Sequence, residues 1–235
     1  MKVMLLAAGY GERMRPLTDK TPKPLLQVAG KPLIEYHIQR LLGAGFDQLV
    51  INVAHLGQQI IDYLGEGERY GVSINYSHEG DEPLDTAGGI RDAHRLLGES
   101  PFAVINADIW TDYPFRQLRQ VKLADRVMAH LVLVPNPEHH PGGDFSLDRD
   151  GYLSPDGESP RYTFAGIGVY RPEFFQGVRS GKLPLRELLL PAMQNKQISG
   201  ELYQGVWQDI GTPERLHRLD QSTREGFHPA PDSPA

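Results

Sequence analysis

The sequence contains no cysteine. This absence excludes disulfide bonds, a thiolate nucleophile and a zinc site with cysteine ligands. It agrees with a protein that works in a reducing compartment. A chain of 235 residues is long enough to bury a stable core without such covalent or metal links. Its chemistry must therefore come from oxygen- and nitrogen-bearing side chains.

Long apolar runs and an excess of positive charge are also missing. No segment approaches the ~18 apolar residues that cross a membrane, and no basic segment followed by an apolar stretch indicates a secretory signal. The 24 Lys and Arg residues against 30 Asp and Glu residues give a formal charge of −6. That balance argues against a sequence-independent nucleic-acid binder. We expect a cytoplasmic protein without membrane or nucleic-acid partners and, because no exposed apolar seam is visible, a monomer.

The order of apolar segments predicts one α/β domain over residues 1–224 and a disordered tail over residues 225–235. Strands are predicted at residues 2–8, 47–53, 72–76, 102–106 and 127–134, and helices at 32–42, 56–64, 86–97 and 115–124. Strands that alternate with helices of this length favour right-handed crossovers and a largely parallel sheet. Ligands of such sheets bind beyond the carboxyl ends of the strands.

The composition changes after residue 135, where proline and glycine become frequent. A short strand-like segment at residues 162–170 predicts an antiparallel addition to the same domain. We further expect a helix at residues 183–194, a strand at 200–207 and a helix at 213–224. Thr212 and Pro213 suit the start of that last helix.

A glycine-rich loop after the first strand carries the strongest local pattern. It reads Leu6-Ala-Ala-Gly-Tyr-Gly-Glu-Arg-Met-Arg-Pro-Leu-Thr18 and is followed by Pro22-Lys-Pro-Leu25. Glycines allow backbone N–H groups to approach a polyphosphate, while Arg13 and Lys23 supply opposite charge. The loop matches neither a Walker A loop nor the dinucleotide-binding fingerprint. The alternative is a tight turn with both cations in solvent.

Two aspartates stand at the ends of apolar runs far apart in the sequence. Asp108 follows the strand predicted at residues 102–106, and Asp209 precedes the last predicted helix. Carboxylates at the edge of a sheet suit Mg²⁺, which takes oxygen ligands and usually only one or two protein carboxylates. Their spacing alone leaves open that Asp108 serves a turn and that Asp209 caps a helix.

The glycine-loop and Pro-Lys-Pro-Leu segments resemble those of the sugar-1-phosphate nucleotidyltransferases, over residues 1 to about 224. The resemblance implies a Rossmann-like, three-layer nucleotidyltransferase domain with a mixed, mostly parallel central sheet. It also implies that Arg13, Lys23, Asp108 and Asp209 are catalytic, with both aspartates binding Mg²⁺. The residues it implies for nucleotide binding are Ala8, Gly9, Gly11, Glu12, Arg13, Lys23, Pro83, Asp85 and Gly88.

The sequence matches the family pattern less completely at the residues expected to bind the sugar. The resemblance implies substrate-binding roles for Asn106, Gly143, Asp144 and Glu158. Many relatives carry a lysine where this sequence has Ser159, and we consider Arg161 a partial replacement. His139 and His140 lie in the proline- and glycine-rich segment, where we expect a surface loop rather than a site.

The activity implied by the resemblance is transfer of UMP from UTP to N-acetylmuramic acid α-1-phosphate. The products are UDP-N-acetylmuramic acid, a nucleotide sugar of peptidoglycan recycling, and pyrophosphate. A sugar phosphate oxygen is already a nucleophile, so we expect direct Mg²⁺-assisted in-line attack at the α-phosphorus. One alternative is a mannose-1-phosphate guanylyltransferase or glucose-1-phosphate thymidylyltransferase. Another is a catalytically silent nucleotide-binding subunit.

Overall fold

The computed structural model describes residues 1–80, 82–156 and 160–226. Glu158, predicted to bind the sugar, lies outside the described residues, as do residues 227–235 of the predicted tail. No helix among the described residues is long and apolar enough to cross a membrane.

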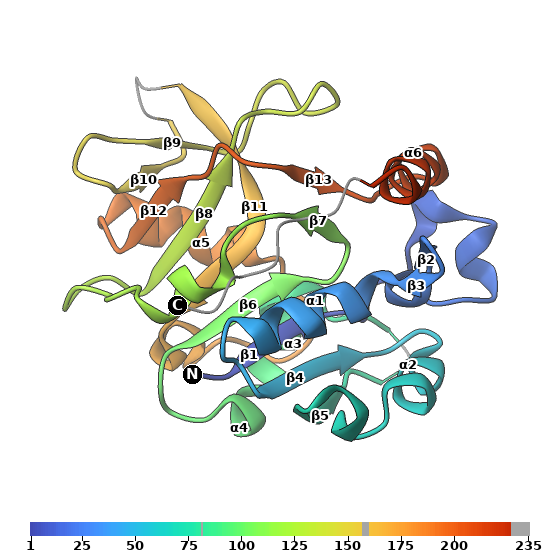
Figure 1. Cartoon of the computed structure of the whole chain (residues 1–235). Helices are drawn as coiled ribbons and strands as arrows, with labels where there is room; N and C mark the ends of the chain where they lie inside the picture. Colours follow the sequence, from blue (N-terminus) through green and yellow to red (C-terminus); the bar gives the residue numbers. More distant parts are fainter. Residues whose placement is uncertain (81, 157–159, 227–235) are drawn as a thin grey trace.

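A mixed sheet of nine strands runs through the centre of the domain (Figure 1). Its parallel half contains, in spatial order, β5 (Ser73–His78), β4 (Gln48–Val53), β1 (Val3–Leu6) and β6 (Phe102–Asn106). The chain passes from β1 outwards to β4 and β5, and β6 then lies on the other side of β1. Such a reversal of strand order creates a crevice at the carboxyl ends of the strands, where ligands bind.

The other half of the sheet is mainly antiparallel. β11 (Arg161–Tyr170) is antiparallel to both β6 and β8 (Ala129–Val134), and β12 (Ile198–Leu202) is parallel to β8. β9 (Phe145–Leu147) pairs with the first residues of β11, and β10 (Leu153–Ser154) pairs with β9. The predicted antiparallel addition therefore enters the main sheet, because most of β11 is buried and needs neighbours on both edges. The mixed sheet of the predicted fold class is confirmed.

Alternating side chains of the strands bury two apolar layers. Val3 and Leu5 of β1 face a cluster that includes residues of α1 (Leu33–Gly43) and α2 (Gly57–Leu64), while Met4 faces the opposite cluster. The second cluster contains residues of α3 (Asp85–Asp92), α4 (His94–Leu97) and α5 (Leu185–Gln194). Because successive strand residues point to opposite faces, this arrangement produces the three layers predicted for the domain.

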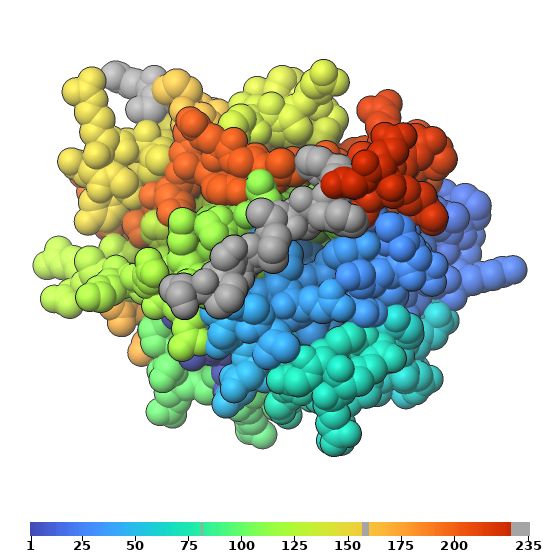
Figure 2. Space-filling view, viewed as in Figure 1, coloured from blue at the N-terminus to red at the C-terminus, as the bar shows by residue number. Residues whose placement is uncertain are grey.

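A third apolar cluster attaches the last helix to the first part of the chain. Leu216 and Leu219 of α6 (Pro213–Arg224) pack with residues of the N-terminal segment such as Met14 and Val28. Figure 2 shows α6, in red, against that blue N-terminal segment. α6 begins as predicted, with Oγ1 of Thr212 accepting a hydrogen bond from the backbone N–H of Arg215. This cluster holds α6 against the segment that contains the glycine-rich loop, beside the carboxyl edge of the sheet.

Some predicted elements differ from the structure. The helix predicted at 115–124 is only a 3₁₀ turn, Phe115–Arg119, because its two buried side chains lie three residues apart and one such turn buries both. The strand predicted at 200–207 is wrong as one element. It divides into β12 and β13 (Trp207–Asp209), since the chain turns tightly at Gly205 against the ring of Tyr203. Three short strands before residue 135 were not predicted: β2 (Gln27–Val28), β3 (Lys31–Pro32) and β7 (Ile109–Thr111).

A buried histidine connects α1 to β7. His37 is 4% exposed, and its Nε2 donates a hydrogen bond to the carbonyl oxygen of Ile109 at 2.9 Å. Burial, assisted by the positive charge of Arg40, lowers the pKa of the imidazole to about 4. A neutral ring with its proton on Nε2 makes this contact, so the uncharged form of His37 anchors the strand that follows Asp108.

We predict that His37 makes the protein less stable as the pH falls from 6.5 towards 4. In this window the unfolded chain binds a proton on His37 that the folded chain excludes, so the free energy of unfolding decreases, by roughly 3 kcal/mol in total for this shift. Urea unfolding at several pH values should show a shallower decrease for His37→Gln, which keeps an N–H donor but does not titrate. The exposed control His217→Gln should follow the wild type. Equal pH slopes for wild type and His37→Gln would contradict this account.

Candidate active site

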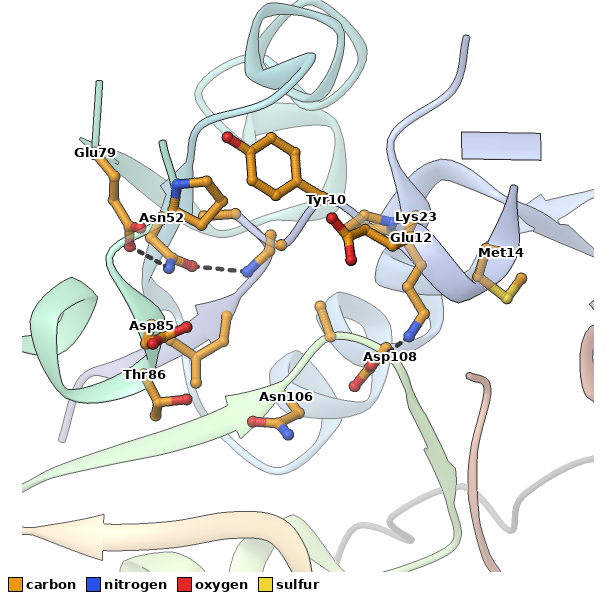
Figure 3. Close-up of a pocket in the computed structure, with 18 of the residues that line it drawn as sticks. Tyr10, Glu12, Met14, Lys23, Asn52, Glu79, Asp85, Thr86, Asn106 and Asp108 are labelled. Atoms are coloured by element: carbon orange, nitrogen blue, oxygen red, sulfur yellow. Dashed lines mark hydrogen bonds and ion pairs between the residues drawn. The ribbon is translucent and has the colours of Figure 1, made fainter. Parts of the chain in front are cut away.

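Two adjoining cavities open at the carboxyl ends of the parallel strands. The larger, of about 610 Å³, lies between the glycine-rich loop and the ends of β1, β4 and β6 (Figure 3). The smaller, of about 350 Å³, lies between the end of β6, β11 and β13. Arg13, Asn106 and Asp108 line both cavities. These three predicted site residues therefore mark the place where two bound molecules would meet.

The glycine-rich loop forms one wall of the larger cavity. The predicted residues Ala8, Gly9, Gly11, Glu12 and Arg13 all line it. Gly11 has a φ of +65°, and a Cβ there would lie 2.8 Å from Cγ2 of Thr18, whereas a Cβ on Gly9 would meet nothing within 4 Å. The turn itself requires Gly11, and Gly9 leaves open space beside the backbone. A phosphate can approach the chain closely at such a position.

Lys23 connects the glycine-rich loop with the first predicted metal ligand. Its side chain is 11% exposed, and its ammonium group pairs with the carboxylate of Asp108 (Figure 3). The Cβ of Lys23 lies 3.4 Å from the position that a Cβ on Gly11 would take. The lysine therefore stands between the loop and the carboxylate, where its charge can act on a phosphate held by the loop.

The pairing of β7 with β13 brings the two predicted metal ligands together. Asp209 lies opposite Ile109 in this antiparallel pair, and the N–H of Ile210 donates to the carbonyl oxygen of Asp108 at 2.8 Å. Both aspartates line the smaller cavity. The carboxylate of Asp209 pairs with the guanidinium of Arg215, a residue that the sequence did not single out.

The donor set at these aspartates fits a magnesium ion that arrives with a phosphate-bearing substrate. Carboxylate oxygens are hard ligands, and Mg²⁺ commonly combines one or two of them with phosphates and water. The described part of the chain holds no group of three or more His, Asp or Glu residues that could bind a metal. Phosphate oxygens and water molecules would therefore complete the coordination.

A buried polar network forms the back wall of the larger cavity. The side-chain oxygen of Asn52 accepts a hydrogen bond from the N–H of Ala7 at 2.7 Å, and its amide donates to Glu79 at 2.6 Å (Figure 3). The second oxygen of Glu79 accepts from the N–H of Leu84 at 2.7 Å. Burial raises the pKa of Glu79, and these hydrogen bonds oppose the rise. The network ties together the ends of three strands, and no local pattern identified Asn52 or Glu79 as site residues.

Three predicted nucleotide-binding residues lie at the start of α3 or just before it, and two of them line the larger cavity. Pro83 and Asp85 line the larger cavity, and the carboxylate of Asp85 lies 4.0 Å from the ammonium of Lys182. Gly88 instead packs against another segment: a Cβ there would lie 2.6 Å from the carbonyl oxygen of Gly181. The structure therefore gives Gly88 a packing role behind the cavity wall, because α3 must approach that backbone closely.

The predicted sugar-binding residues are only partly brought together. Asn106 lines the smaller cavity, but Gly143 and Asp144 are not among the described residues that line either cavity. Asp144 accepts a hydrogen bond from the N–H of Phe164 at 2.8 Å, and Arg161 donates to the backbone oxygen of Asp144 at 2.8 Å. Asp144 therefore holds the loop on β11, and Arg161 is engaged there instead of at a cavity.

The two adjacent histidines lie on a surface loop beside the smaller cavity. His139 and His140 line the smaller cavity. Nε2 of His139 lies 2.8 Å from Oδ1 of Asp209, and Nε2 of His140 lies 3.3 Å from Oδ1 of Asp144. The exposed side chain of His139 agrees with the expected surface loop, but this loop borders the smaller cavity because the fold brings the distant Asp209 close to it.

An open α/β sheet with a glycine-rich loop, a lysine and two aspartates at its crevice defines a phosphate-handling α/β enzyme. The sequence model of one family, described as "Nucleotidyl transferase", matches residues 2–226, and the chain belongs to that family. The family predicted from the glycine-rich loop is thereby confirmed.

Three known proteins show the range of this similarity. The chain is 51% identical over 220 residues to the N-acetylmuramate alpha-1-phosphate uridylyltransferase of Neisseria meningitidis serogroup B, covering 92% of this chain and 95% of that protein. It is 34% identical over 224 residues to a mannose-1-phosphate guanylyltransferase catalytic subunit beta of Drosophila pseudoobscura pseudoobscura, covering 90% and 59%. The solved structure of a putative glucose-1-phosphate thymidylyltransferase from Bacillus anthracis has a TM-score of 0.82 at 21% identity, covering 99% and 98%.

We predict that Asn52→Ala destabilises the protein by about 1–3 kcal/mol, because the N–H of Ala7 and one oxygen of Glu79 lose their buried partner. The KM for the nucleoside triphosphate should rise, since the cavity wall loses its connection to β1. Urea unfolding and steady-state kinetics measure both effects. Asn75→Ala, at an exposed position of β5, is the control. Equal stability and equal KM for the two variants would show that the network does not support the cavity.

Proposed function

We propose that this protein transfers UMP from UTP to N-acetylmuramic acid α-1-phosphate, giving UDP-N-acetylmuramic acid and pyrophosphate. The observation that carries the proposal is the meeting of the two cavities at Arg13, Asn106 and Asp108. UTP would occupy the larger cavity and the sugar phosphate the smaller one. The choice of these substrates is supported by the 51% identity to the Neisseria uridylyltransferase over nearly the whole of both chains.

The reaction requires two anions to approach each other. An oxygen of the sugar phosphate forms a bond to the α-phosphorus of UTP, and the bond to the bridging oxygen of the β-phosphate breaks as pyrophosphate leaves. No protein nucleophile is needed. In our proposal Arg13 and Lys23 reduce the repulsion and stabilise negative charge on the leaving group, while the N–H groups of the glycine-rich loop hold the phosphates in line.

Asp108 and Asp209 would hold Mg²⁺, which screens the phosphate charges when bound. Both carboxylates are paired with cations in the structure, Asp108 with Lys23 and Asp209 with Arg215. These ion pairs compensate the negative charges of the two neighbouring carboxylates when no metal ion is bound. Lys23 would then share its charge between Asp108 and the α-phosphate.

We propose that the nucleotide base binds beside Asp85, in the part of the larger cavity away from Lys23. Pro83, Asp85 and Lys182 line this cavity, and Asp85 lies on the side opposite the pair formed by Lys23 and Asp108 (Figure 3). The second candidate reaction uses GTP and mannose 1-phosphate, and the 34% identity to the Drosophila enzyme favours it. That match covers only 59% of the relative, which makes it the weaker candidate.

The test of substrate choice is a matrix of UTP, GTP, dTTP and ATP against the 1-phosphates of N-acetylmuramic acid, N-acetylglucosamine, glucose and mannose, with pyrophosphate release as the readout. We expect UTP with N-acetylmuramic acid α-1-phosphate to have the highest kcat/KM. A higher value for GTP with mannose 1-phosphate would establish the second candidate.

We place the reaction in the cytoplasm, where UTP is available, in the reuse of a peptidoglycan sugar. We also propose a monomer, which light scattering tests.

We predict that Asp108→Ala and Asp209→Ala each lower kcat/KM at least ~100-fold, about 2.7 kcal/mol of transition-state stabilisation. The physical reason is the loss of a ligand to the magnesium ion at the junction of the cavities. Pyrophosphate release at several Mg²⁺ concentrations measures the effect, with the exposed Asp125→Ala as control. A decrease of less than threefold for either aspartate would remove it from the proposed metal site.

A further inference from the structure

Arg215, in the first turn of α6, lies next to residues that line the two cavities, although it is not itself among the described residues that line them. Its Nη1 pairs with Asp209 and lies 2.8 Å from Nε2 of His139, and both of these residues line the smaller cavity. Its Nη2 lies 2.7 Å from the position that a Cβ on Gly211 would take, and Gly211 lines the larger cavity. Its side chain is 19% exposed. The guanidinium therefore lies next to residues of both cavities.

Positive charges outnumber negative charges around Gly211. A Cβ on Gly211 would lie 3.1 Å from Nη2 of Arg13, 2.7 Å from Nη2 of Arg215 and 2.9 Å from Oδ2 of Asp209. Two guanidinium groups thus flank one carboxylate. The proposed function assigns that carboxylate to the metal ion. Once Asp209 serves the metal, the two arginines face each other with one negative charge fewer, and an anionic group placed between them would restore the balance.

The position of Arg215 is fixed by its helix. Its backbone N–H donates to Oγ1 of Thr212, and Pro213 occupies the beginning of α6. The next residue, Leu216, packs in the apolar cluster that contains Ile210 and Trp110. Because the backbone is held on both sides of Arg215, only its side chain has to turn to exchange one anionic partner for another.

We propose that Arg215 binds the phosphate of the sugar 1-phosphate and exchanges Asp209 for that phosphate when substrate and metal are bound. The inference rests on the proposed function, since it assumes a sugar phosphate in the smaller cavity. Guanidinium groups bind phosphate oxygens with two parallel hydrogen bonds, which orients the phosphate as well as neutralising it. The contact partners His139 and Asp209 place Arg215 on the side of the attacking phosphate. The leaving pyrophosphate belongs to the glycine-rich loop and Arg13.

The test compares Arg215→Gln and Arg215→Lys with Arg218→Gln, an exposed arginine one turn further along the same helix. In the forward reaction we expect Arg215→Gln to raise the KM for N-acetylmuramic acid α-1-phosphate at least tenfold, with the KM for UTP changed less than twofold. Arg215→Lys, which keeps the charge but not the paired hydrogen bonds, should show a smaller rise. In the reverse reaction the KM for pyrophosphate should stay within twofold of the wild type. Arg218→Gln should match the wild type throughout.

A binding measurement separates phosphate recognition from a structural role. Calorimetric titration of N-acetylmuramic acid α-1-phosphate into the enzyme with UMP and Mg²⁺ should show at least tenfold weaker binding for Arg215→Gln. Binding of the unphosphorylated sugar should not differ between Arg215→Gln and the wild type. Thermal unfolding confirms that each variant is folded, and Arg215→Lys carries the test if Arg215→Gln is not.

Two failures are distinguishable. A wild-type enzyme that turns over no sugar phosphate with UTP would overturn the proposed function. An active wild type whose Arg215→Gln and Arg215→Lys variants keep the KM for the sugar phosphate within twofold would overturn the role of Arg215 alone. A rise confined to the KM for pyrophosphate would assign Arg215 to the leaving group and also overturn the inference.

Discussion

The pairing of two three-residue strands, β7 and β13, is the constraint on which the site depends. It places Asp209 opposite Ile109 and joins Ile210 to the backbone of Asp108. Without this pairing nothing would hold the two carboxylates, which are far apart in the sequence, close together in space. The surroundings hold this pairing from both sides: His37 contacts the backbone of β7, and the cluster around Trp110 and Ile210 attaches α6. The metal site proposed here is therefore a product of tertiary packing far more than of local sequence.

Charge compensation is the second organising feature. Acidic and basic side chains meet in pairs at the junction of the cavities, with Lys23 on Asp108 and Arg215 on Asp209. A polar group buried without a partner is costly, so a site that must later hold phosphates and a cation benefits from partners that substitute for them. In this view the lysine and the arginine exchange carboxylate for phosphate during the reaction. The glycine-rich loop and the network around Asn52 stay in place meanwhile and form the fixed walls.

Local patterns in the sequence predicted the elements whose conformation is determined by residues close to them in the chain. The buried first strand, the loop around Gly11 and the start of α6 at Thr212 each carry their information within a few residues. The type of residue at Asp108 and Asp209 was also informative, but their proximity required strands too short to show periodicity. His139, Arg215 and Asn52 could not be found in this way. Each acquires its role from a contact with a distant segment, as His139 does with Asp209.

The most direct test of the account is a crystal structure of the protein with a non-hydrolysable UTP analogue and Mg²⁺. The account predicts that the triphosphate lies along the glycine-rich loop in the larger cavity. It also predicts one metal ion bound by the carboxylates of both Asp108 and Asp209. A nucleotide bound elsewhere, or a metal ion that contacts neither aspartate, would contradict it.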